Sequence, residues 1–228
     1  MRGLSVLSVR RIFTTVKAVI NLAIAEHGLD IRNAFAAIYM PEAESKKRVS
    51  IPVETIRQIQ QSCVEHDDDM RWLIALISDT GMRLAEAAGF HIDDIKLDED
   101  IPYVDIKPYP WRSLKTRGSQ RQVPLVGASL WAAQRIKANA SSCFAFPRYT
   151  DNTRCNANSA SNALNKWLHA NFRKDIVIHG FRHAMRDRLR TVSCPSEMID
   201  QIGGWSSGKV GEGYGEGYSD LQTTQWMT

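Results

Sequence analysis

Apolar side chains recur along most of the chain at the spacing of amphipathic helices. Over residues 8–26, Ile12, Val16, Val19 and Ile20 fall on one face of such a helix. The same spacing predicts further helices at 52–64, 69–79, from 83 onward, 128–139, 157–171, 181–192 and 196–202. Two short runs with β-branched residues beside turn formers, 102–107 and 121–125, predict strands. The pattern is that of a mainly helical protein with a small sheet in the middle of the chain.

A break in the pattern divides the chain. Residues 41–50 have little apolar surface to bury, so we expect a linker there and two parts, 1–48 and 49–228. No apolar run approaches the roughly 18 residues of a membrane span, and residues 1–11 lack the features of a signal peptide. The four cysteines are widely spaced, which argues against a zinc site and favours free thiols in a reducing cytoplasm.

The distribution of charge changes this picture more than the composition does. The 228 residues carry a net charge of +4, but residues 51–100 hold 4 basic and 12 acidic groups, whereas residues 101–190 hold 16 basic and 4 acidic ones. Such an excess of Lys and Arg is a candidate surface for a polyanion, because these side chains make most contacts to phosphate. A basic face that is merely solvated explains the excess about as well.

Two short motifs near the C-terminal end do not fit their surroundings. Residues 203–210 nearly match a P-loop, but Val210 replaces the hydroxyl residue that binds magnesium, and a helix instead of a strand is predicted before them. Residues 204–208 match the G-x-S-x-G pattern of serine hydrolases, but that order needs a later histidine, and the last histidine is His183. We therefore expect neither nucleotide binding nor serine hydrolysis.

Four segments, taken in order, carry a stronger signal. They are 80–86 (TGMRLAE), 114–124 (LKTRGSQRQVP), 179–183 (HGFRH) and 202–214 (IGGWSSGKVGEGY). Together they resemble the tyrosine recombinase (phage-type integrase) family, whose pattern is an Arg in a T-G-x-R-x-x-E box, a hairpin Lys, H-x-x-R, a His or Trp, and then a Tyr. The resemblance implies a mainly α catalytic domain with a small antiparallel sheet of three strands (α+β) over 49–228. It also makes 1–48 the last part of a helical, DNA-binding core-binding domain with its linker.

The resemblance assigns the central chemistry to four residues. Arg83 and Arg182 bind the scissile phosphate, because their planar guanidinium groups match the charge that grows there in the transition state. Lys115 is the general acid that protonates the leaving 5′-oxygen. Tyr214 is the nucleophile that forms a 3′-phosphotyrosine, with Tyr218 as its rival. The glycines that surround both tyrosines lead us to expect a segment that is loosely held until DNA and a neighbouring subunit order it.

Further residues are expected to assist. By the same resemblance, His179 takes part in proton transfer near the attacking oxygen. Trp205 takes the place more often held by His, and its indole N–H can donate a hydrogen bond to phosphate. Glu86 and His183 are expected to support these residues. Candidate contacts to the DNA backbone are Arg112, Arg117, Arg121 and Lys174.

The reaction of the family sets the expected partners. Guanidinium groups neutralise the phosphate and the phosphotyrosine conserves the bond energy, so we expect no cofactor and no metal. The partner is double-stranded DNA, on which the family acts as a homotetramer, while the free chain is expected to be a monomer in the cytoplasm, away from membranes. The expected activity is site-specific strand cleavage and rejoining, for the integration or excision of a mobile element. The alternatives are a type IB topoisomerase, an inactive DNA-binding module, and a helical interaction protein without a nucleic-acid role.

Overall fold

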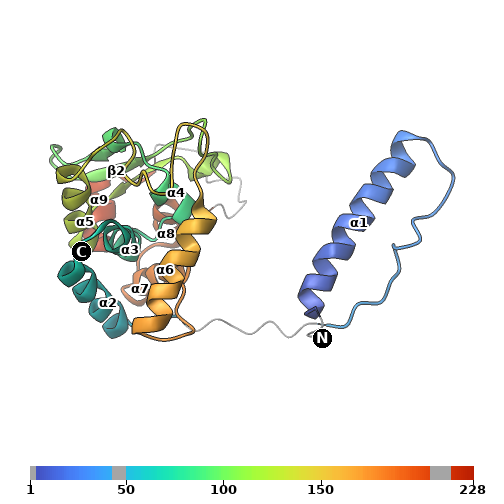
Figure 1. Cartoon of the computed structure of the whole chain (residues 1–228), viewed down its shortest axis with the longest axis horizontal. Coiled ribbons are helices and arrows are strands. Elements are labelled where there is room, and N and C mark those ends of the chain that lie inside the picture. Colours follow the sequence, from blue (N-terminus) through green and yellow to red (C-terminus); the bar gives the residue numbers. More distant parts are fainter. Residues whose placement is uncertain (1–3, 43–49, 206–216) are drawn as a thin grey trace. The chain divides into compact units, whose positions relative to one another are not determined.

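The computed structural model describes residues 4–42, 50–205 and 217–228, without the side chain of Arg117. The chain divides into two compact units, Met1–Val49 and Ser50–Thr228 (Figure 1). Within the described ranges, no helix combines the length and the apolar composition needed to cross a lipid bilayer.

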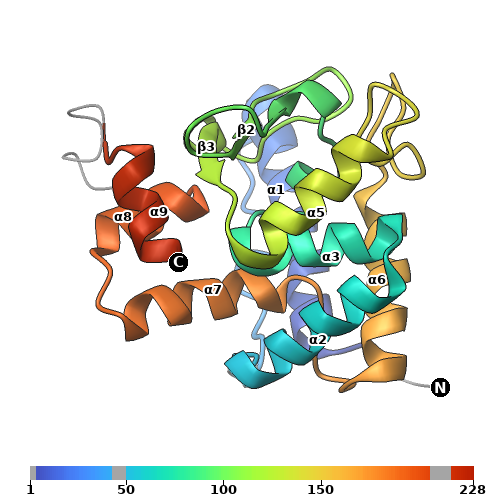
Figure 2. The same cartoon turned by 90° about the vertical axis from the view of Figure 1, so that its left-hand side faces the viewer.

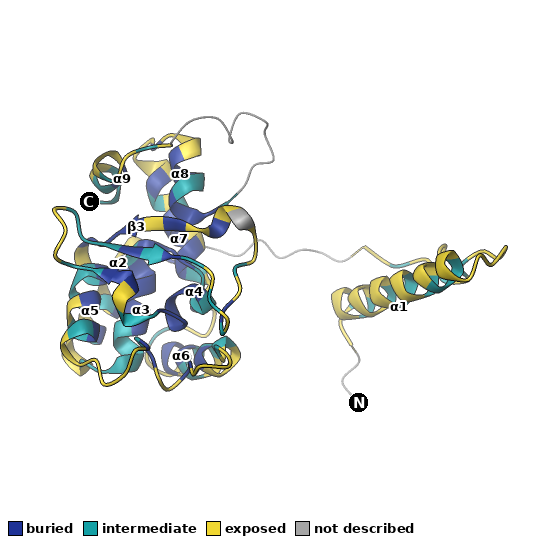
Figure 3. Cartoon of the chain, turned by 90° about the horizontal axis from the view of Figure 1, so that it is seen from above, coloured by how far each residue is buried: buried dark blue, intermediate teal, exposed yellow. Residues whose placement is uncertain are grey.

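The first unit contains one long described helix, α1 (Val6–Glu26), where the sequence predicted a helix over 8–26. The segment after it is tied back to the helix, since Lys17 Nζ donates a hydrogen bond to the Ala36 carbonyl at 3.0 Å. No residue of α1 is buried, whereas dark, buried positions fill the interior of the second unit (Figure 3). The first unit therefore contributes little apolar core of its own.

The second unit consists of helices packed around a small sheet. Its described elements are α2 (Val53–His66), α3 (Asp69–Thr80), α4 (Leu84–Ala88), η1 (Ile92–Asp94), β1 (Ile95–Lys96), β2 (Tyr103–Ile106), η2 (Arg117–Ser119), β3 (Arg121–Pro124), α5 (Gly127–Ala138), α6 (Ala157–Asn171), α7 (Gly180–Thr191), α8 (Ser196–Gly203) and α9 (Asp220–Met227). The predicted helices and both predicted strands are present with similar boundaries. The mainly helical fold with a three-stranded antiparallel sheet is confirmed, but helix α9 was not predicted.

Helix α3 forms the centre of the second unit. The side chain of its N-cap residue Asp68 accepts a hydrogen bond from Arg71 N at 3.0 Å, and Gly81 ends the helix with a left-handed φ of +60°. Between these ends, every residue from Leu73 to Ser78 is buried, as expected of a helix covered on all sides. Helices α2, α5 and α7 pack against α3 (Figure 2). This packing fixes the position of the Gly81 turn, at which the candidate site begins.

The sheet has the order β1–β2–β3, and both pairs of strands are antiparallel. In the second pair, Val104 lies opposite Val123 and Ile106 lies opposite Arg121. Side chains alternate between the two faces of a strand, so the face that buries Val123 also buries Arg121. A charged side chain is therefore directed into the protein at the start of β3.

A second, smaller core joins α7 to the C-terminal helices. Its buried members are Met185, Leu189, Cys194, Met198, Ile199 and Ile202, with Trp226 and Met227 of α9 packed against them. Helix α9 begins with a capping box, in which Ser219 Oγ accepts from Gln222 N at 3.3 Å and Gln222 Oε1 accepts from Ser219 N at 3.0 Å. Helices α8 and α9 both contact β3, so the C-terminal end of α8 lies beside the buried Arg121.

Candidate active site

The turn between α3 and α4 places Arg83. Arg83 is the N-cap residue of α4 and has an extended backbone. The Glu86 carboxylate accepts hydrogen bonds from Arg83 N at 2.9 Å and from Arg83 Nη1 at 2.6 Å. One carboxylate thus caps the helix and orients the guanidinium group, which is why an Arg and a Glu three residues apart form one local structure.

Arg121 joins this pair from the sheet. Its Nη2 lies 3.1 Å from Glu86 Oε2, and its side chain is only 5% exposed. Its other nitrogens also have partners, since Nε donates to the Ile202 carbonyl at 2.7 Å and Nη1 donates to the Ser119 carbonyl at 2.8 Å. We expected Arg121 to contact the DNA backbone. The strand instead directs the guanidinium group inward, where each nitrogen has a partner within the protein, and the expected DNA contact stays a prediction.

Arg182 enters the same place from α7. It is buried, and its Nη1 donates to the Gly81 carbonyl at 2.8 Å while its Nη2 donates to the Gly203 carbonyl. The Gly81 turn therefore carries Arg83 two residues further on and also anchors Arg182 from a distant helix. Gly81 has a φ of +60°, which residues with a side chain rarely adopt, and a Cβ atom there would lie 2.4 Å from Met185 Sδ and 3.0 Å from Met185 Cβ of α7, so backbone conformation and packing both favour glycine.

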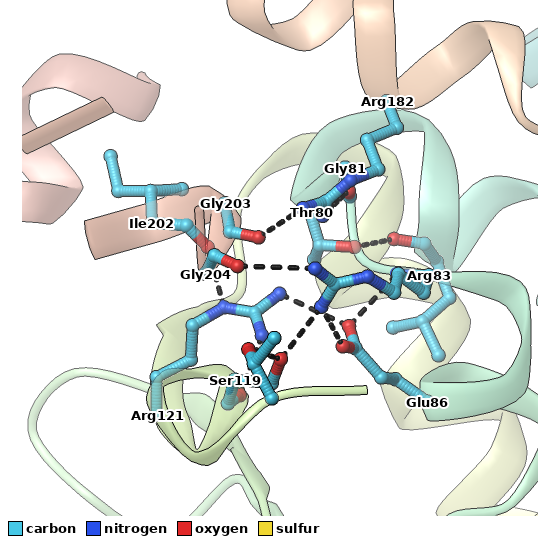
Figure 4. A network of polar contacts seen from close by, with 12 residues as sticks. Thr80, Gly81, Arg83, Glu86, Ser119, Arg121, Arg182, Ile202, Gly203 and Gly204 are labelled. Carbon is cyan, nitrogen blue, oxygen red and sulfur yellow. Dashed lines mark hydrogen bonds and ion pairs between the residues drawn. The ribbon is translucent and has the colours of Figure 1, made fainter. Parts of the chain in front are cut away.

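Three arginines converge on the C-terminal end of α8 (Figure 4). The successive carbonyls of Ile202, Gly203 and Gly204 accept hydrogen bonds from Arg121, Arg182 and Arg83, respectively. The last carbonyls of a helix have no intrahelical partner and carry the negative end of the helix dipole, so cations are favoured there. The end of α8 is therefore held by the side chains that the sequence singled out for phosphate binding, and by Arg121.

The electrostatics of this cluster favour an anion. Three guanidinium groups, those of Arg83, Arg121 and Arg182, face the single carboxylate of Glu86, which leaves a net charge of +2 among these four residues. Burial, followed by the positive charges of Arg83 and Arg121, lowers the pKa of Arg182 to about 9. Burial alone would raise the pKa of Glu86, but Arg121 and the hydrogen bonds from Arg83 lower it below its ordinary value. The unbalanced positive charge would be relieved by a bound phosphate.

Lys115 belongs to the loop between β2 and β3, a few residues before Arg121 in the sequence. Lys115 is exposed. The hydroxyl of its neighbour Thr116 lies 2.9 Å from Ser119 Oγ, which in turn accepts a hydrogen bond from Arg83 Nη1 at 3.0 Å. The loop is thus tied to Arg83 through Ser119, a partly buried contact that the sequence did not predict. An exposed ammonium group on such a loop remains accessible to a substrate.

His179 and His183 flank Arg182 in the sequence, and Trp205 stacks on its guanidinium group. His179 is the N-cap residue of α7, and its ring centroid lies 5.0 Å from that of His183; both side chains are exposed. Trp205 follows α8 and covers the Arg182 guanidinium at 4.2 Å and that of Arg186 at 4.8 Å. Cation–π contacts therefore fix the Trp205 ring against Arg182, one arginine of the cluster.

Comparison with known proteins identifies the family of this chain. Residues 50–216 match the phage integrase family. The chain belongs to that family. Tyrosine recombinase XerC of Neisseria meningitidis serogroup C / serotype 2a (strain ATCC 700532 / DSM 15464 / FAM18) is 25% identical over 193 residues, which cover 81% of this chain and 60% of the relative. This phage integrase family chain therefore spans less than two thirds of the length of that relative.

Solved structures of integrases share the fold of this family member. The Tn1549 transposon integrase in complex with a circular intermediate DNA has a TM-score of 0.67 at 16% identity, covering 98% of this chain and 75% of that one. A lambda integrase tetramer bound to a Holliday junction has a TM-score of 0.62 at 17% identity, covering 90% of this chain and 60% of that one. At these identities the likeness concerns the fold.

Two tyrosines compete for the role of nucleophile in this integrase family chain. Tyr214 lies outside the described residues, as does most of the glycine-rich segment around it. The backbone of Tyr218 is fixed to α8, since Gln201 Oε1 accepts from Tyr218 N at 2.8 Å and Gln201 Nε2 donates to the Tyr218 carbonyl at 2.8 Å. The assignment of Tyr214 as nucleophile stays a prediction.

The other candidate DNA contacts differ in their surroundings. Arg112 is buried and donates to the carbonyls of Glu86 and Lys107, and its expected contact with the DNA backbone stays a prediction. Lys174 is exposed, and the side chain of Arg117 lies outside the described part of the chain. Among the described residues, no group of His, Cys, Asp and Glu side chains is arranged to hold a metal ion.

Proposed function

We propose that this chain is the catalytic part of a site-specific DNA recombinase that cleaves and rejoins strands through a 3′-phosphotyrosine, for the integration or excision of a mobile element. The observation that carries the proposal is the convergence of Arg83 and Arg182 at the end of α8, with one carboxylate for three guanidinium groups. Membership of the phage integrase family supports it.

In the proposed reaction, the Tyr214 hydroxyl attacks the scissile phosphorus while the bond from phosphorus to the 5′-oxygen breaks. Arg83 and Arg182 would stabilise the charge on the phosphate oxygens. His179 would accept the tyrosine proton, and Lys115 would give a proton to the leaving 5′-oxygen. The reverse attack by a 5′-hydroxyl of another strand would release the tyrosine. The phosphotyrosine conserves the bond energy, so rejoining would need no nucleotide.

We also propose duplex DNA as the partner, a homotetramer on the DNA and a monomer away from it, in the cytoplasm. The lambda integrase tetramer on a Holliday junction supports the tetramer. Residues 1–48 would be the end of a helical core-binding domain. That role is supported by the apolar side chains that α1 leaves exposed, which are Leu7, Ile12, Val19 and Leu22. Such a row of apolar side chains would pack against further protein.

Covalent trapping tests the activity and the nucleophile together. The full chain is mixed with nicked duplexes taken from the ends of its genetic element, so that the released fragment diffuses away and the phosphotyrosine accumulates. A protein–DNA adduct that survives denaturation is expected with the wild-type chain and with Tyr218→Phe, but not with Tyr214→Phe. The control is Tyr39→Phe, because Tyr39 is 84% exposed and removal of an accessible hydroxyl elsewhere should not change the yield.

Each other outcome has a definite meaning. Loss of the adduct only with Tyr218→Phe would keep the chemistry and replace the nucleophile. Relaxation of plasmids that lack the paired sites would favour a type IB topoisomerase. Binding of the duplexes without any adduct would favour an inactive DNA-binding module, and failure to bind any duplex at low salt would remove the nucleic-acid role.

A further inference from the structure

Arg121 is the member of the arginine cluster to which no chemical role has been given. Its guanidinium group donates three hydrogen bonds: from Nη2 to the Glu86 carboxylate of α4, from Nε to the Ile202 carbonyl of α8, and from Nη1 to the Ser119 carbonyl of its own loop. The group therefore joins three segments that lie far apart in the sequence. Because all three kinds of nitrogen are bonded and the side chain is 5% exposed, it has little means to contact DNA.

The backbone at Gly204, directly after α8, packs against the Arg121 guanidinium group. Gly204 has a left-handed φ of +61°, and a Cβ atom there would lie 2.6 Å from Arg121 Nη1. The Gly204 carbonyl accepts from Arg83 Nη2 at 3.2 Å, and the next residue, Trp205, covers Arg182 at 4.2 Å. The positions of Trp205 and of the backbone that leads toward the tyrosines thus depend on the same side chain that holds Glu86.

We infer that Arg121 is a positioning residue of the active site, which fixes Arg83 through Glu86 and fixes the segment carrying Trp205 through the Ile202 carbonyl. The inference rests on the proposed strand-transfer reaction only where it concerns the reaction rate. A lysine cannot replace Arg121 in this task, because one ammonium group cannot reach three partners that the planar fork reaches together.

The test compares Arg121→Met and Arg121→Lys with a matched control, Arg188→Met. Arg188 also pairs with a carboxylate and a backbone carbonyl, Asp79 Oδ1 at 3.0 Å and Ser78 O at 2.7 Å, but it contacts none of the residues around Arg121. All variants are studied in the full chain at a temperature at which each is folded. The control therefore subtracts the general effect of losing an arginine that pairs with a carboxylate and a backbone carbonyl.

Three measurements separate positioning from DNA contact. Backbone hydrogen exchange over 202–205 should become about tenfold faster in Arg121→Met than in the control, because a local clamp is lost. The slope of the logarithm of the association constant for the duplex against the logarithm of the salt concentration should not change. Loss of a phosphate contact would reduce the magnitude of this slope by about 0.9. The rate of adduct formation at saturating duplex should fall about 100-fold, since small misplacements of reacting groups cost that much.

Arg121→Lys should regain part of the thermal stability but not the rate of adduct formation. A reduced salt slope in Arg121→Met, or exchange over 202–205 no faster than in the Arg188→Met control, would overturn the inference. If the wild-type chain formed no adduct, the proposed function would fail, but the exchange and salt measurements would still decide the role of Arg121.

Discussion

Replacing Glu86 by glutamine removes the carboxylate that holds Arg83 and Arg121 together. The Glu86 side chain is 4% exposed, and its two oxygens accept from Arg83 N, from Arg83 Nη1 and from Arg121 Nη2. Glutamine has nearly the same shape but only one acceptor oxygen. Its amide nitrogen would face a donor, so at least one of the three bonds would become a contact between two donors.

The expected loss of stability follows from this burial. Removing one partner of a buried ion pair costs about 3–5 kcal/mol. Since the Arg83 side chain is 22% exposed and glutamine keeps one acceptor, we take the lower end, about 3 kcal/mol. For a protein of this size, that loss lowers the melting temperature by about 6–12 °C.

Thermal denaturation followed by circular dichroism measures this effect. Glu54→Gln is the matched control, because Glu54 pairs with Arg57 at 3.6 Å while both side chains are more than 70% exposed, at 72% and 71%. A surface pair of this kind contributes less than about 1 kcal/mol. If Glu86→Gln melted at the same temperature as Glu54→Gln, the reasoning about the buried cluster would be refuted.

The same variant should also change the response to acid. The pKa of Glu86 is lower in the folded chain than in the unfolded chain, so its contribution to stability is complete above the unfolded value, about 4.3. The contribution is lost as the pH falls through the folded pKa. The difference in melting temperature between wild type and Glu86→Gln should therefore shrink below about pH 4, and a constant difference from pH 7 to pH 3 would contradict the assignment.

Three further changes test other parts of the structure. Gly81→Ala should lower the stability by more than about 1 kcal/mol in chemical denaturation, because φ is +60° and the new Cβ would lie 2.4 Å from Met185 Sδ; unchanged stability would contradict this packing. A thiol reagent should label the exposed Cys143 in the native chain but Cys63 only after unfolding, because burial raises the pKa of the Cys63 thiol to about 12. Equal labelling rates for the two cysteines in the native chain would show that Cys63 is accessible. Trp205→Phe keeps a ring over both guanidinium groups and should cost less than about 1 kcal/mol, so that a large fall in adduct yield would assign a role to the indole N–H.

Helix α3 and helix α9 show what local sequence patterns can and cannot predict. The ends of α3 coincide with a capping Asp68 and with Gly81, and its apolar run is continuous, so all the signals are local. Helix α9 has few apolar residues, and one of them, Leu221, is 59% exposed. The capping box of Ser219 and Gln222 was the signal that could have revealed it.

Arg121 and Arg112 show why burial is harder to predict than secondary structure. Arg121 alternates with Val123 and Leu125, so the pattern of β3 already placed its side chain on the inner face. The basic character of the surrounding block led us to expect a surface residue instead. No comparable pattern marks Arg112, because its burial depends on the carbonyl of distant Glu86 and on the ring of Phe90, which lies 5.3 Å from the guanidinium carbon.

The arrangement at the end of α8 links charge to conformation. The carbonyls of Gly203 and Gly204 accept hydrogen bonds from the two arginines that we propose to bind phosphate, so these nitrogens are shared between the protein and the proposed substrate. Carbonyl oxygens carry only partial charge, and a phosphate would compete for the same donors more strongly. Arg83 and Arg182 would then hold the backbone before Trp205 less firmly. Arg121 would still hold it, because its Nε donates to the Ile202 carbonyl. In the proposed reaction, the buried Arg121 would thus keep this segment in place while Arg83 and Arg182 bind the phosphate.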